Sequence, residues 1–178
     1  MSSIYHISLT KEEGQVVTLE EYKDKVLLVV NVPVNTGSTA QHKKLEQLYA
    51  NYKDMGFEIL AVQTDEFDIK LFGDKHQFSF PLFQATRVRG EGQHELYKIL
   101  TTDAPDSFGT FYSQAKRAFI KRGLDVGHDN DVMWNFEKFL INKQGVVVKR
   151  FAPEIHPDDS RLIEVLDKEI GNISSLSA

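Results

Sequence analysis

The chain has 178 residues, of which 41% are hydrophobic and 26% are charged, and its net charge is −5. This length suits one domain with a hydrophobic core and is short for two. Because Lys and Arg are scattered through an acidic chain, a nucleic-acid or anionic-membrane surface is not expected, and a small molecule or another protein is the expected partner.

The sequence contains no cysteine. Disulfide bonds, thiolate metal sites and thiol nucleophiles are therefore excluded, whatever the fold. The N-terminus shows no basic segment followed by an apolar run, and no apolar stretch approaches the roughly 20 residues of a membrane helix. We therefore expect no signal peptide, no anchor and a cytoplasmic location, and no pattern calls for a cofactor or a metal.

Short alternating segments open the predicted fold. Residues 5–10 and 15–18 predict an N-terminal hairpin, and Thr18 is expected to cap a helical turn over 19–22. A run of Val and Leu at 26–32 then predicts a strand that is buried on both faces.

The stretch 31–39, where this strand ends, is the expected centre of function. Ligands and reactive groups collect at the carboxyl ends of strands in open α/β sheets. Ser38 or Thr39 is placed to cap the next helix, whose positive end favours an anion near residue 36. That helix runs to about residue 55, with Gly56 ending it.

A second strand over 57–62 follows the helix, so strand, helix and strand form a right-handed crossover with a parallel pair. Residues 63–67 therefore emerge at the same sheet edge as Thr36. The next predicted elements are a short helix at 69–76, an extended edge segment at 80–83, a helix at 95–100 and a helical piece at 113–122. The segment 101–131 is otherwise irregular and has no assigned purpose.

The last part of the chain predicts a hairpin and a helix. Residues 133–141 run from a turn into a core strand that pairs with 146–151. Pro157 is expected in the first turn of a final helix that Gly171 ends.

The order of these elements is the thioredoxin arrangement with extra segments. We therefore predict an α/β fold, a three-layer sandwich with a central mixed sheet, an N-terminal hairpin and helices on both faces. One domain is expected over 1–171, with a frayed tail at 172–178.

Several segments are similar to one known family. The sequence WNFEKFLI at 134–141 is highly specific. Individually weaker matches are the strand at 25–32, the set Gly37, Thr39 and Gln41, and the segments 56–60, 80–83 and 96–98. Together they resemble the glutathione peroxidase family over almost the whole chain.

The resemblance implies hydroperoxide reduction through a cysteine or selenocysteine, assisted by a glutamine, a tryptophan and an asparagine. Trp134 and Asn135 match two of these positions. Thr36 stands at the peroxidatic position and Glu66 at that of the glutamine, with Gly37 and Phe67 as neighbouring pocket residues. Glutathione or thioredoxin is an expected partner only if the chain is active.

These departures oppose the family's chemistry. An unactivated threonine hydroxyl is neither soft nor ionised near neutral pH, and it gives no sulfenic acid for a thiol to reduce. The charge of Glu66 would stand beside a position where the family forms an anion. We therefore predict a homologue that has lost the peroxidase mechanism and acts as a binding or regulatory protein, with its pocket between Thr36, Glu66 and Trp134.

Two other functions stay open. One is an enzyme with residual or altered activity, either hydrolytic or a weak peroxide reaction in oxidative stress. The other is an inactive subunit that pairs with a genuine peroxidase.

Each candidate residue also has a purely structural interpretation. Trp134 is then a half-buried aromatic, Asn135 a turn residue and Thr36 a hydroxyl bonded to local backbone. The remaining polar groups are expected to be solvated or satisfied locally: the acidic loop of Asp65, Glu66 and Asp68 with His76, the turn 128–131, the lone histidines His42, His94 and His156, and the basic cluster Lys116, Arg117, Lys121 and Arg122.

Overall fold

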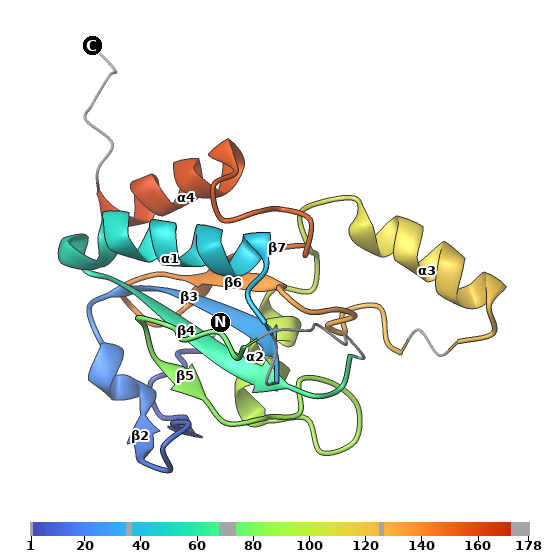
Figure 1. Ribbon diagram of the computed structural model, residues 1–178, viewed down its shortest axis with the longest axis horizontal. Coiled ribbons are helices and arrows are strands. Elements are labelled where there is room, and N and C mark those ends of the chain that lie inside the picture. The colour runs from blue at the N-terminus through green and yellow to red at the C-terminus, as the bar shows by residue number, and fades with distance from the viewer. Residues whose placement is uncertain (1, 35–36, 68–73, 125–126, 172–178) are drawn as a thin grey trace.

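A five-stranded mixed sheet forms the centre of the computed structural model, which describes residues 2–34, 37–67, 74–124 and 127–171 (Figure 1). The three parallel strands are β5 (Leu82–Phe83), β4 (Phe57–Thr64) and β3 (Val26–Pro33). The strands β6 (Lys138–Ile141) and β7 (Val147–Phe151) follow beyond β3 and run antiparallel to their neighbours.

The central strand β3 is buried along its whole length because it is apolar on both faces. Successive side chains of a strand point to opposite sides of the sheet. Val26, Leu28 and Val30 accordingly enter one hydrophobic core, whereas Leu27 and Val29 enter the other. The unbroken run of Val and Leu thus specifies the middle layer of a sandwich, as predicted.

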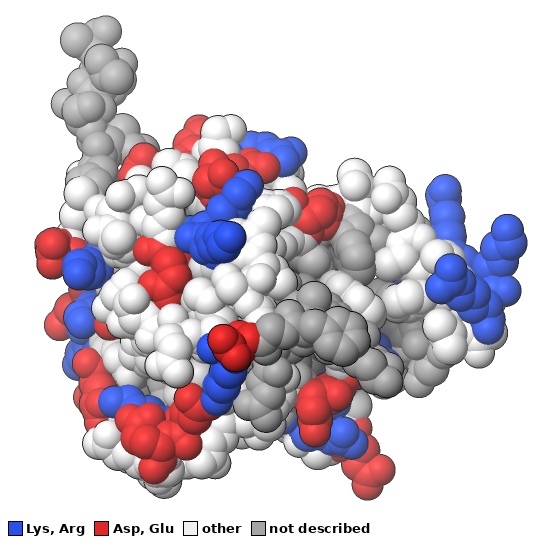
Figure 2. Space-filling view, viewed as in Figure 1, with Lys and Arg blue, Asp and Glu red and all other residues white. Residues whose placement is uncertain are grey.

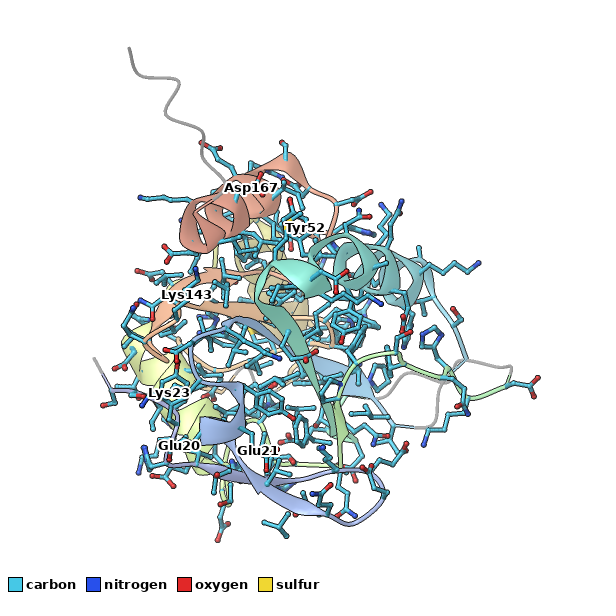
Figure 3. The ribbon with its side chains drawn as sticks, turned by 90° about the vertical axis from the view of Figure 1, so that its left-hand side faces the viewer. Glu20, Glu21, Lys23, Tyr52, Lys143 and Asp167 are labelled. Atoms are coloured by element: carbon cyan, nitrogen blue, oxygen red, sulfur yellow. The ribbon has the colours of Figure 1, made fainter. Side chains whose placement is uncertain are left out.

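Two helices cover one face of the sheet, α1 (Ala40–Tyr52) and α4 (Ser160–Ile170) (Figure 1). Leu45 of α1 and Leu162 of α4 share a core with Leu28. The Tyr52 hydroxyl donates a hydrogen bond of 2.7 Å to the Asp167 carboxylate and joins the two helices (Figure 3).

The opposite face is covered by helix α2 (Glu95–Asp103), by the hairpin of β1 (Ser8–Thr10) and β2 (Val16–Thr18), and by the 3-10 turn η1 (Leu19–Tyr22). Leu96 of α2 and Val17 of the hairpin pack in the same core as Leu27. The predicted thioredoxin-like sandwich with helices on both faces is confirmed. No helix in the described ranges is long and apolar enough to span a bilayer.

Some predicted helix boundaries are wrong. A 3-10 turn, η2 (Lys53–Met55), separates α1 from Gly56, whose φ of +75° suits glycine at a helix end. Thr18 precedes η1, but its side chain makes no capping hydrogen bond. Pro157 lies before α4, because the Asp159 carboxylate accepts the backbone N–H of Arg161 and begins the helix there.

Two strand and helix predictions need similar correction. The strand predicted within 133–141 begins only at Lys138, because residues 134–136 form a turn held by β3. The predicted helix at 69–76 lies mostly outside the described residues, and its described part, 74–76, is not helical. The tail 172–178 also lies outside them.

The irregular segment is organised by one buried cation. The Arg150 side chain is 2% exposed and forms an ion pair with the buried Glu137. A guanidinium has five N–H donors, so it can satisfy several acceptors at once. Arg150 also donates to the carbonyls of Ala104, Pro105, Asn130 and Asp131 at 2.7–3.3 Å. Arg150 therefore connects strand β7 to the segments just before and just after the stretch that carries α3 (Phe111–Lys121).

Replacing Arg150 by Met should lower the free energy of unfolding by about 3–5 kcal/mol, because Glu137 and several carbonyls are left buried without their partner. Lys149→Met on the same strand is the matched control and should cost about 1 kcal/mol or less, since Lys149 contributes a partly exposed contact over the Phe108 ring. Urea unfolding measures both. Equal losses for the two variants would contradict this role of Arg150.

Candidate functional site

The sheet topology brings the predicted site residues to one edge. Pro33 at the end of β3 is paired in register with Thr64 at the end of β4, and β6 begins beside β3 with the pair Val30 and Lys138. Gly37 and Glu66 therefore follow neighbouring strand ends, and Asn135 precedes the third. Gly37 is buried, whereas Thr36 lies outside the described residues.

Trp134 and Phe67 lie together at this edge. Their ring centroids are 6.0 Å apart, and the Arg89 guanidinium lies 5.8 Å from the centre of the Phe67 ring. Trp134 is half-buried and packs against the core on the α2 side of the sheet. Trp134 is therefore a half-buried aromatic that packs against the core, as its structural interpretation predicts, and it also lies at the edge.

Asn135 carries the least expected feature of the site. Its side chain is 0% exposed, yet neither its amide nitrogen nor its amide oxygen has a hydrogen-bond partner among the described residues. Leaving a buried polar group unpaired costs about 1–3 kcal/mol. The residue lies in a turn as predicted, but a turn does not require the amide to be buried.

Asn31 of β3 holds this turn in place. Its side-chain nitrogen donates to the carbonyl of Trp134 at 2.9 Å, and its own carbonyl accepts the backbone N–H of Phe136 at 2.7 Å. Phe136 adopts a φ of +65°, a conformation rarely taken by residues other than glycine. The buried strand thus fixes the backbone on both sides of Asn135. Sequence reasoning did not single out Asn31, although a lone Asn within a run of Val and Leu is the signal for it.

The Glu66 carboxylate has hydrogen-bond partners in its own loop and in a neighbouring segment. Its carboxylate accepts the backbone N–H of Val88 at 2.5 Å and the Thr64 hydroxyl at 3.1 Å. These bonds join the loop after β4 to the segment before α2. The carboxylate therefore has a structural role that the sequence does not reveal.

The N-terminus of α1 is closed by a histidine. Thr39 caps the helix, as predicted, and its hydroxyl accepts the backbone N–H of His42 at 3.3 Å. In return, Nδ1 of His42 accepts the backbone N–H of Thr39 at 3.0 Å. This reciprocal pair is a capping box with His in place of the usual Glu or Gln.

His42 is 1% exposed and lies among aromatic rings. The rings of His76, Phe78 and Phe136 have their centroids 4.8–5.3 Å from that of His42. Burial, with a smaller effect from His76, lowers the pKa of His42 to about 4. His42 is therefore neutral at pH 7, as its acceptor role requires. The spacing Thr39-x-x-His42 is the sequence signal that could have revealed this pair.

The other predicted polar groups do not converge. Asp65 is exposed, Asp68 lies outside the described residues, and His76 faces Glu46 with 3.6 Å between Nε2 and Oε1. Across the described ranges, no three His, Asp or Glu side chains are grouped so that they could hold a metal ion. His94 caps α2 by accepting the backbone N–H of Leu96 at 3.1 Å.

Comparison with known proteins identifies the family. A family model described as glutathione peroxidase matches residues 4–101, more than half of the chain. The chain belongs to the glutathione peroxidase family. It is 33% identical to the thioredoxin/glutathione peroxidase BtuE of Escherichia coli over 162 residues, which cover 85% of this chain and 88% of that protein.

Other relatives agree with this assignment. The hydroperoxy fatty acid reductase gpx1 of Synechocystis is 33% identical over 168 residues, covering 89% of this chain and 91% of that protein. Among solved structures, T. cruzi GPX1 superposes with a TM-score of 0.74 at 27% identity and covers 96% of this chain and 97% of that chain. This glutathione peroxidase homologue contains no cysteine, so the thiol of a cysteine peroxidase has no counterpart here.

The pH dependence of stability should report on His42. Because its pKa in the folded chain lies below the usual 6.5, its stabilisation is complete above pH 6.5 and is lost as the pH falls towards 4. The loss should be on the order of 3 kcal/mol. His42→Gln keeps an acceptor for the capping box without a titrating ring, so its unfolding free energy should fall less over this range.

Urea unfolding at pH 7 and pH 4.5 measures the difference. His6→Gln is the control for the same substitution at a histidine whose side chain is 58% exposed. Parallel profiles for the natural chain and His42→Gln would contradict the assignment.

Proposed function

We propose that this member of the glutathione peroxidase family does not reduce hydroperoxides through a thiol, and that it serves as a binding or regulatory protein. The observation that carries the proposal is the lack of cysteine in a chain that otherwise keeps the family's scaffold. Attack on a peroxide O–O bond needs a soft nucleophile that is ionised near neutral pH. An alcohol meets neither condition, and its oxidation gives no sulfenic acid for a thiol to reduce.

The surroundings of the edge also support this proposal. The Glu66 carboxylate, at the position of the family's glutamine, accepts hydrogen bonds from the backbone N–H of Val88 and the Thr64 hydroxyl, so it is already engaged in structural contacts. His42, near the start of α1, is committed to the capping box, so its Nδ1 does not offer a free base to a hydroxyl at this edge. The proposed ligand pocket is the edge between residue 36, Glu66 and Trp134.

A ligand there would meet an aromatic surface and a buried amide. Trp134 and Phe67 offer apolar ring faces, and Asn135 has one donor group and one acceptor without partners among the described residues. A small molecule that combines an apolar part with a hydrogen-bonding group suits this set. The unpaired amide of Asn135 therefore supports the proposal that this edge still binds a ligand.

Peroxidase assays test the central claim. With hydrogen peroxide or an organic hydroperoxide, and with glutathione or thioredoxin as reductant, turnover should equal the buffer blank. BtuE of Escherichia coli, assayed alongside, serves as the positive control. Catalytic consumption of peroxide by the purified natural chain would overturn the proposal and favour residual or altered peroxidase activity.

Restoring the missing groups should restore the chemistry. Thr36→Cys with Glu66→Gln introduces a thiol at the strand end and removes a competing charge, and Gln still offers an acceptor to Val88. Peroxide turnover should rise at least about tenfold over the natural chain. Ser38→Cys with Glu66→Gln is the matched control and should stay at the blank. If both double variants are inert, the edge no longer supports the family's reaction at all.

The Asn135 amide gives a separate test on stability. Asn135→Leu removes an unpartnered buried polar group of similar size, so the free energy of unfolding should stay equal or rise by about 1 kcal/mol. Asn31→Leu should lower it by about 1–3 kcal/mol, because the Trp134 carbonyl loses its donor. Thermal or urea unfolding compares the two. A large loss of stability in Asn135→Leu would mean that Asn135 is kept for structure and not for a ligand.

A further inference from the structure

Helix α3 stands away from the body of the molecule (Figure 1). Within residues 114–124, no side chain belongs to either hydrophobic core. Two of its aliphatic side chains face solvent, with Ile120 65% exposed and Leu124, just past the helix, 53% exposed. Ile120 lies in the last turn of the helix, and Leu124 follows it directly after Gly123 ends the helix with a φ of +69°. Aliphatic groups on a projecting tip are not explained by the core.

The same helix carries the strongest concentration of positive charge. Lys116, Arg117, Lys121 and Arg122 lie within seven residues, and no Asp or Glu occurs from 107 to 124. The chain has a net charge of −5, so these four cations leave −9 on the rest of it. Figure 2 shows Lys and Arg side chains gathered at the outer end of the helix.

The helix is held at its base by specific contacts. The backbone N–H of Thr110 donates to the Glu154 carboxylate at 2.6 Å. Gly109 has a φ of +133°, and a Cβ there would lie 2.4 Å from Glu154 Oε1, so only glycine fits. On the other side, Lys116 pairs with Asp129 at 2.7 Å. The outward direction of α3 is therefore built into the fold.

We propose that α3 is a docking helix for an anionic phospholipid surface. Aliphatic side chains between cations are typical of helices that lie in the interface of a membrane. Because α3 projects from the body of the molecule, a planar fluid surface can reach it without a matching groove (Figure 1). The remainder of the chain carries a net charge of −9, so the attraction to an anionic surface is concentrated at this tip.

This surface differs from the partner class that composition favours. Charge averaged over the whole chain predicts no membrane partner, whereas the fold gathers the cations on one projecting element. Docking of this kind is peripheral and requires no membrane-spanning segment. It also does not depend on the chemistry proposed for the sheet edge.

The charges set the expected strength of binding. A cation near an anionic membrane contributes about 1 kcal/mol, which is about fivefold in partitioning. With Lys116 already paired to Asp129, the other three cations predict a preference of about a hundredfold for anionic over neutral vesicles. The preference should weaken as salt is raised, because counterions screen the attraction.

Vesicle flotation tests the proposal with the full chain. The natural chain should float with vesicles of equal parts phosphatidylcholine and phosphatidylserine and remain behind with phosphatidylcholine alone. Lys121→Gln with Arg122→Gln should weaken partitioning about 25-fold. Ile120→Ser with Leu124→Ser should also weaken it, at unchanged charge. Circular dichroism confirms that each variant is folded.

Lys23→Gln with Lys53→Gln is the matched control, because it removes the same charge from exposed positions far from α3 in sequence and should leave flotation unchanged. Equal flotation of the α3 variants and the natural chain would overturn the proposal. Failure of the natural chain to bind anionic vesicles would also overturn it. The same holds if the natural chain does not float but sediments as an oligomer, and the Ile120→Ser with Leu124→Ser variant dissociates that oligomer.

Discussion

The two-sided burial of β3 is the constraint from which the rest of the structure follows. Val and Leu fill both faces of the strand, so each face must be covered by a layer of helices or by the hairpin. Because the strand is also central, its ends meet the ends of β4 and β6 at one edge. Asn31, the one polar side chain of the strand, then bonds to Trp134 and fixes the turn at that edge. The core and the candidate site are therefore one structural unit.

Because the core and the candidate site share residues, the chain can keep the family's most specific motif, residues 134–141, although it lacks the family's cysteine or selenocysteine. In the segment 134–138, Trp134 packs in the core and Phe136 lies edge-on to His42. Glu137 pairs with Arg150, and the Lys138 ammonium donates to the Phe136 carbonyl at 2.6 Å. Most of the motif is thus required to build the scaffold, and its presence alone does not imply catalysis. Asn135 is the exception, since its side chain makes no bond among the described residues.

The sequence predicted the layers of the fold because they depend on periodicity, which is a local property. The strands at β3 and β4, the hairpins and helix α1 follow from apolar spacing and turn residues. Features that depend on distant partners were not predictable. Arg150 looks like an ordinary strand cation until the fold brings the carbonyls of Ala104 and Asn130 to it. Glu66 likewise looked like a free charge, because Val88 lies 22 residues away along the chain.

The position of the buried amide bears on whether the edge still has a function. A site that no longer binds anything is expected to lose unpaired buried groups, because their replacement by apolar residues raises stability at no cost. Local strain persists at Phe136 beside it, and strain of this kind is tolerated where the surrounding structure enforces it. Here Asn31 enforces it through two hydrogen bonds from a strand that cannot move without disturbing both cores. The geometry around Asn135 is therefore fixed by a strand whose side chains are packed in both cores.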